Sequence, residues 1–63
     1  MPDLLRQKRE EHFLTQEELA KKAGLHRSTL VRIEMGQEKP RAKTVRRLAR
    51  ALGIQARELV GTA

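Results

Sequence analysis

The fold of this chain is decided by the stretch Thr15–Gly36, TQEELAKKAGLHRSTLVRIEMG. Leu19 and Ala23 are four residues apart, which places them on one side of a short helix. Gly24 follows at once, where a residue in the left-handed conformation can end that helix. Apolar residues then resume at helical spacing, so the stretch predicts two short helices joined by a turn that contains glycine.

The second helix of this stretch has an inner and an outer side. Leu30 and Ile33 supply the inner side. With about 100° of rotation per residue, the outer arc carries mostly polar and basic side chains, namely Arg27, Ser28, Val31, Arg32 and Met35. A short helix with such an outer arc is typical of proteins that place a helix in the major groove of DNA.

The stretch resembles the helix-turn-helix of the Cro and lambda-repressor-like regulators, also called the XRE family. The family pattern, begun at Gln16, has apolar residues, one alanine and one glycine at fixed places. Those places are filled here by Leu19, Ala20, Ala23, Gly24, Leu25, Leu30 and Ile33. The resemblance covers essentially the whole chain. It implies an all-α fold, a compact five-helix lambda-repressor-like domain in which residues 16–35 form the helix-turn-helix.

Length and composition agree with one small domain over residues 1–63. The chain has no cysteine, so neither a disulfide nor a cysteine-ligated metal can support the core. His12 and His26 are far apart in sequence, so we expect no metal and no cofactor. Neither a long apolar run nor a signal peptide is visible, which predicts a cytoplasmic, nucleoid-associated protein without membrane contact.

The net charge of +6 is unevenly distributed along the chain. Residues 1–38 hold seven basic and seven acidic residues, whereas residues 39–63 hold seven basic residues against Glu58 alone. The interpretation that needs no function is that this excess charge forms a solvated basic face. Beside a helix-turn-helix, a flank that contacts phosphates is the better interpretation.

Start and stop signals predict five helices. Thr15 and Glu18 have the spacing of a capping box, and Gly24 and Gly53 stand where helices end. We expect the first helix over about 3–11, the second between Thr15 and Gly24, and the others over about 27–35, 42–52 and 56–60. Residues 61–63 are expected to be disordered.

A structural ion pair is predicted between Arg9 and Glu34. Arg9 takes the core-facing place one turn after Leu5, and Glu34 lies four residues after Leu30, near the inner side of its helix. The resemblance points the same way, because an Arg–Glu pair that joins these two helices recurs in the family. The alternative is that both side chains are exposed and unpaired.

The resemblance also implies which residues touch DNA. Base contacts in the family come from the places held here by Arg27, Ser28 and Arg32, and two arginines favour guanine. Val31 would suit a thymine methyl group, although a surface valine needs no such explanation. Phosphate contacts are expected from residues at the start of the second helix and in the next loop and helix, namely Gln16, Lys39, Arg41, Lys43 and Arg46. For Gln16, a plain role as a polar residue at a helix start is the alternative.

These features predict a sequence-specific regulator of transcription, a repressor that binds double-stranded DNA as a homodimer on a palindromic operator. Leu59 and Val60 are the apolar candidates for the dimer interface. An enzyme is not expected, because the sequence shows neither a nucleophile–base arrangement nor a glycine-rich phosphate loop. The rival hypothesis is an antitoxin or adaptor module whose main partner is another protein.

Overall fold

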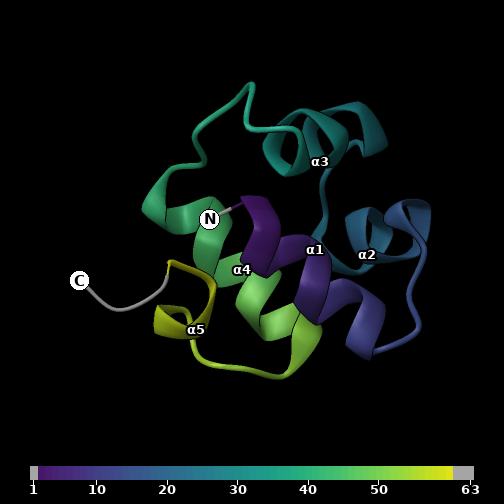
Figure 1. Ribbon diagram of the computed structural model, residues 1–63, viewed down its shortest axis with the longest axis vertical. Coiled ribbons are helices and arrows are strands. Elements are labelled where there is room, and N and C mark those ends of the chain that lie inside the picture. Colours follow the sequence, from purple (N-terminus) through teal and green to yellow (C-terminus); the bar gives the residue numbers. More distant parts are fainter. Residues whose placement is uncertain (1, 61–63) are drawn as a thin grey trace.

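The computed structural model describes residues 2–60, which form five α-helices and no strand (Figure 1). The helices are α1 (Pro2–Glu11), α2 (Gln16–Ala23), α3 (Arg27–Glu34), α4 (Ala42–Leu52) and α5 (Arg57–Val60). The predicted all-α fold is confirmed, and the predicted bounds differ by one residue at the starts of α1 and α5 and at the end of α3. The expectation of disorder at residues 61–63 lies outside the described residues.

Both ends of α2 are fixed by local hydrogen bonds. The Thr15 hydroxyl accepts a bond from the Glu18 N–H (3.0 Å), and the Glu18 carboxylate accepts one from the Thr15 N–H (2.8 Å). Hydrogen bonding with Thr15 lowers the pKa of the Glu18 carboxyl, and the bond from the Thr15 backbone N–H has the largest effect. At the other end, Gly24 adopts φ 71° and donates its N–H to the carbonyls of Ala20 and Lys21. The capping box and the glycine stop therefore set the length of α2 as the sequence predicts.

The core is built from one apolar side of each helix. Helix α2 packs against α3 and α4, while α1 packs against α3 and α5. Ala20 and Ala23 of α2 and Ala49 of α4 are buried, and such small side chains let crossing helices approach closely. Among residues 3–60, the buried apolar side chains are Leu5, Leu19, Ala20, Ala23, Leu30, Ile33, Val45, Leu48, Ala49, Leu52 and Leu59.

This arrangement places α3 at the edge of the molecule, with α5 at the opposite end of the view in Figure 1. A loop over residues 35–41 then leads from α3 to the start of α4. One long side of α3 is therefore free of other helices, and the next loop lies beside it. No helix within residues 2–60 is long and apolar enough to cross a membrane.

Candidate nucleic-acid interface

Helix α3 carries the side chains that the sequence predicts as base readers. Leu30 and Ile33 are completely buried, and this burial fixes the rotation of α3 about its own axis. The opposite arc is consequently turned to solvent. Its members are exposed, apart from the half-buried valine: Arg27, Ser28, Val31 and Arg32. The structure thus brings the four predicted readers to one outward surface.

The guanidinium of Arg32 is held by two side chains. Its Nε donates to Oε1 of Glu38 at 3.0 Å, and its second terminal nitrogen lies 3.4 Å from the hydroxyl oxygen of Thr29. Arg32 is 48% exposed and Glu38 is 38% exposed, so the pair lies at the surface. The guanidinium keeps further N–H donors that these two partners do not use. Arg32 is therefore oriented in advance while it can still bind a ligand.

Glu38 is a site residue that the sequence analysis missed. It reaches Arg32 because the end of α3 folds back on itself: the N–H groups of Gln37 and Glu38 both donate to the Arg32 carbonyl, at 2.9 and 3.2 Å. Gly36, with φ 76°, makes this turn possible, since few other residues adopt that conformation. A glycine just after a helix that carries a predicted reader is the signal that could have pointed to this contact.

Beneath the outward surface, α1 and α3 are joined by the Arg9–Glu34 pair. Arg9 Nε lies 2.7 Å from Glu34 Oε2, and a second guanidinium nitrogen lies 3.1 Å from Oε1. Only 12% of the Arg9 side chain and 3% of the Glu34 side chain is exposed. The hydrogen bonding of Arg9 to the Glu34 carboxylate is the main reason that the pKa of Arg9 is raised. Arg9 also donates to the Leu14 carbonyl at 2.8 Å, and this bond connects α1 to the loop before α2.

Gln16 belongs to the same network. Its side-chain nitrogen donates to Oε1 of Glu34 at 3.2 Å, so Glu34 binds side chains from both α1 and α2. An amide nitrogen has two hydrogens, and the second is free to bind an anion. Gln16 and Arg27 also line one hollow of about 490 Å³, which brings this predicted phosphate ligand beside a predicted base reader. The sequence predicted the Arg9–Glu34 contact but not the bond from Gln16.

A row of cations lies along the loop that follows α3 and on the first half of α4. All its members are exposed, and no ion pair within residues 2–60 involves any of them: Lys39, Arg41, Lys43 and Arg46. We call these four residues the basic edge. They are the phosphate ligands that the sequence predicts, together with Gln16.

The start of α4 is unusually positive for a helix N-terminus. Its first turn contains Lys43 and no acidic residue, and the side chain of its N-cap residue, Arg41, makes no capping hydrogen bond. The helix dipole disfavours cations at this end, and the first N–H groups have no partner within the helix. A bound phosphate would satisfy these N–H groups and neutralise the cations.

The predicted dimer residues have different surroundings. Leu59 is completely buried in the core of the protomer, so it does not belong to a surface that a second copy could cover. Val60 is 57% exposed and lines a hollow of about 430 Å³ together with Pro40 and Val45. Of the two predicted interface residues, the structure leaves Val60 at the surface, because α5 turns Leu59 inward.

Within the part of the chain that the structure describes, no three His, Cys, Asp or Glu side chains form a group that could hold a metal ion. His12 and His26 are both exposed, on separate loops. His26 is the residue before α3, and its side chain makes no capping hydrogen bond.

Comparison with known proteins places this geometry in context. The family model for the helix-turn-helix matches residues 5–59. An HTH-type transcriptional regulator of Methanothermobacter thermautotrophicus is 45% identical over 53 residues, which cover 84% of this chain and 77% of that protein. A second regulator so named, from Methanocaldococcus jannaschii, is 37% identical over 94% of this chain and 89% of its own length. The immunity repressor of Bacillus phage phi105 is 47% identical over 84% of this chain and 37% of the repressor.

Proposed function

Because the chain belongs to the XRE-type helix-turn-helix family, we propose that it regulates transcription by binding double-stranded DNA in a sequence-specific manner. The observation that carries this proposal is the outward surface of α3. Polar and basic side chains gather there, opposite two completely buried residues, and the basic edge follows it directly in the chain. The relatives named as regulators and the phage repressor support the same conclusion.

In this proposal α3 enters the major groove. Arg27 and Arg32 donate to guanine edges, Ser28 contacts a further base, and Val31 lies against a thymine methyl group. Gln16 and the basic edge bind the phosphates on either side, which supplies affinity without sequence preference. Specificity and affinity therefore come from different elements, α3 for the first and the loop with α4 for the second.

We further propose that the protein is a homodimeric repressor. Val60 is an exposed apolar side chain next to a hollow, and it would lie in the contact between two copies. A twofold axis would hold the two α3 helices about 34–36 Å apart, one turn of DNA, so the operator would be palindromic. Sedimentation of the protein with and without an operator duplex tests this assembly, and a complex with one chain per duplex would contradict it.

Replacing Lys43 or Arg41 by alanine should weaken binding to all duplexes alike. Each variant should lower the slope of log K against log salt concentration by about one unit, because one phosphate contact fewer releases about one counterion fewer. Fluorescence anisotropy with an operator and a random duplex, at several salt concentrations, measures this slope. Arg6→Ala, which removes an exposed cation of α1, is the control and should leave the slope unchanged. An unaltered slope for Lys43→Ala would remove that residue from the phosphate contacts.

Glu38→Ala should make the protein less selective. The variant frees Arg32 and removes a negative charge next to the proposed DNA surface, so binding to random DNA should strengthen. The ratio of operator to random affinity should fall about fivefold, the upper range for an exposed ion pair. Glu10→Ala is a matched control, since Glu10 also forms an exposed pair, with Arg6 on α1. If Glu38→Ala keeps the affinity ratio of the unmodified protein, Glu38 does not orient a base reader.

A further inference from the structure

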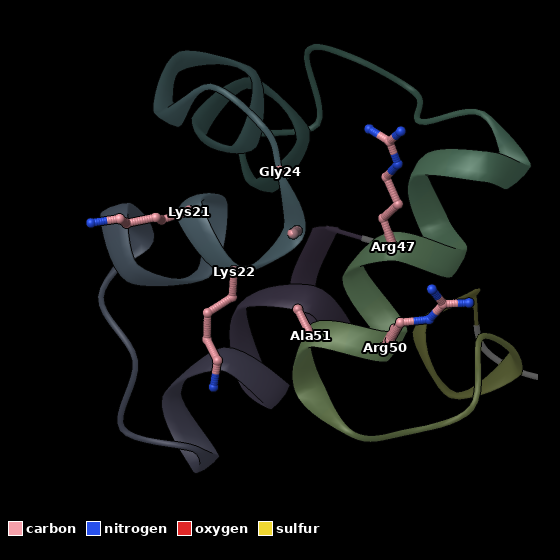
Figure 2. Close-up of a pocket in the computed structure, with 7 residues that line it drawn as sticks. Lys21, Lys22, Gly24, Arg47, Arg50 and Ala51 are labelled. Carbon is pink, nitrogen blue, oxygen red and sulfur yellow. The ribbon is translucent and has the colours of Figure 1, made fainter.

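A second basic surface lies between the C-terminal end of α2 and the middle of α4. There the molecule has a hollow of about 580 Å³ whose rim carries four cations, Lys21, Lys22, Arg47 and Arg50. Gly24 and Ala51 lie between them, and Figure 2 shows the small side chain of Ala51 in the centre of the group. The hollow exists because small residues of α2 and α4 face each other while long side chains surround them.

The cations of this hollow have no carboxylate in direct contact, although the charge of Lys22, after the hydrogen bonds with Thr15, helps to lower the pKa of the Glu18 carboxyl four residues earlier. No acidic residue lines the hollow, and no ion pair within residues 2–60 involves any of its four cations. Arg6 has such a partner in Glu10 and Arg32 has one in Glu38, whereas the cations of the basic edge, like those of this hollow, form no ion pair within residues 2–60. Lys21 and Lys22 stabilise the C-terminal end of α2 through its dipole, and Arg50 does the same in the last turn of α4, so the dipoles leave Arg47, in the middle of α4, unexplained.

The shape of the group favours an extended ligand. The four side chains run in different directions around Gly24 and Ala51 in Figure 2, so their charged ends do not meet at one point. A single small anion could therefore contact only some of them. A chain with several negative charges, laid across the hollow, could contact all four.

The position along α4 separates this hollow from the proposed DNA surface. Lys43 lies in the first turn of α4, and Arg50 follows seven residues later, about 10 Å further along the helix. Arg46 lines a different hollow, with Pro40 and Val60, so neighbouring arginines of α4 serve different surfaces. Most of the excess charge of residues 39–63 thus lies on two surfaces, and in the proposed function a straight duplex on α3 would account for the basic edge but not for this hollow.

We infer that the hollow between α2 and α4 binds an acidic segment of a partner protein. Charge complementarity identifies the partner: glutamate and aspartate side chains would pair with the four cations, and an apolar side chain would rest on Gly24 and Ala51. The small floor of Gly24 and Ala51 fits an apolar side chain of a peptide better than a sugar–phosphate backbone, which carries a charge at every nucleotide. The site goes beyond DNA binding and would let a second protein join or control the regulator.

A labelled peptide of alternating glutamate and leucine is a suitable probe. Its binding to the full chain is measured by fluorescence anisotropy, and the binding of a random duplex is measured in parallel. The double variant Lys22→Gln/Arg50→Gln should bind the peptide about fivefold to tenfold more weakly, because each exposed pair contributes little alone. Arg57→Gln is the single-charge control on α5, outside this hollow, and should change peptide binding by less than twofold.

Several outcomes would overturn the inference. An equal loss of peptide binding per charge removed in Arg57→Gln would show that the peptide follows the overall positive charge. A loss of duplex binding by the double variant as large as its loss of peptide binding would assign the hollow to the DNA backbone. Absence of peptide binding by the unmodified protein would also contradict the inference. The proposed DNA-binding function would still stand if that protein selects a specific duplex.

Discussion

Glu34→Ala should lower the free energy of unfolding by about 3–5 kcal/mol, the usual loss when one partner of a buried ion pair is removed. Only 3% of the Glu34 side chain is exposed, and it accepts hydrogen bonds from Arg9 and Gln16. Without it, the Arg9 guanidinium remains charged and nearly buried with no anionic partner. The variant should be close to unfolded at room temperature, because a domain of about 60 residues has a thin stability margin.

Urea unfolding followed by circular dichroism measures this loss. The melting temperature should fall by about 4–8 °C for each kcal/mol in a domain of this size. Glu10→Ala is the matched control, because Glu10 is 57% exposed in its pair with Arg6, and exposed pairs contribute about 0–1 kcal/mol. If Glu34→Ala and Glu10→Ala lower the free energy of unfolding by the same small amount, the Arg9–Glu34 pair does not hold α3 in place.

The double variant Arg9→Met/Glu34→Leu separates a loss of charge from a loss of packing. Apolar residues of similar size often replace a buried ion pair without loss of stability. Here the double variant should regain only part of the free energy of unfolding that Glu34→Ala loses, because the Leu14 carbonyl and the Gln16 amide would lose their hydrogen-bond partners. A double variant as unstable as Glu34→Ala would show that these side-chain hydrogen bonds matter more than the ion pair.

Arg27→Ala and Arg32→Ala should each cost about 1–3 kcal/mol in binding to the operator. Each arginine can donate two hydrogen bonds to one guanine, so its loss should also relax the base preference at one position of each half-site. Binding to random duplexes should change much less, because phosphate contacts dominate there. Competition binding against operators that carry one altered base pair measures both effects.

Arg27 and Arg32 differ in the contacts that orient their side chains. Arg32 is held by Glu38 and Thr29, whereas Arg27 begins α3 beside Gln16 in a hollow. Lysine at position 32 keeps the charge but loses the planar fork that Glu38 orients, so Arg32→Lys should lose selectivity while it keeps most affinity for random DNA. Equal losses on operator and random duplexes, for both alanine variants, would show that neither arginine reads bases.

The arrangement of helices could be predicted because its signals are local. The capping box at Thr15 and Glu18 and the glycines at 24 and 53 mark helix ends in the sequence itself, and the structure has these ends. The contact between Arg9 and Glu34 could also be predicted, because each residue takes a core-facing place on its own helix.

Other features depend on how the elements meet, and the sequence did not reveal them. The Arg32–Glu38 contact requires the turn at Gly36, and the Gln16–Glu34 bond requires the packing of α2 against α3. The basic hollow depends on the approach of α2 to α4, which no spacing within one helix can predict.

The part-buried network of Arg9, Gln16 and Glu34 joins the fold to the proposed function. Glu34 ends α3 on its inner side and binds Arg9 of α1 and Gln16 of α2, so the outward surface of α3 is fixed against two other helices. Binding then needs little ordering of α3. The cations of the basic edge are exposed and form no ion pair within residues 2–60, and phosphate contacts tolerate variation in their position because phosphates carry no sequence information.

Selection of bound sites from a pool of random duplexes tests most directly whether α3 reads DNA sequence. The bound fraction should become enriched in a palindrome, with guanine prominent in each half-site and half-site centres about one helical turn apart. The same selection with Arg27→Ala/Arg32→Ala should lose that consensus while the protein stays folded. A pool that shows no enrichment after repeated rounds, with unmodified and folded protein, would contradict sequence-specific DNA binding.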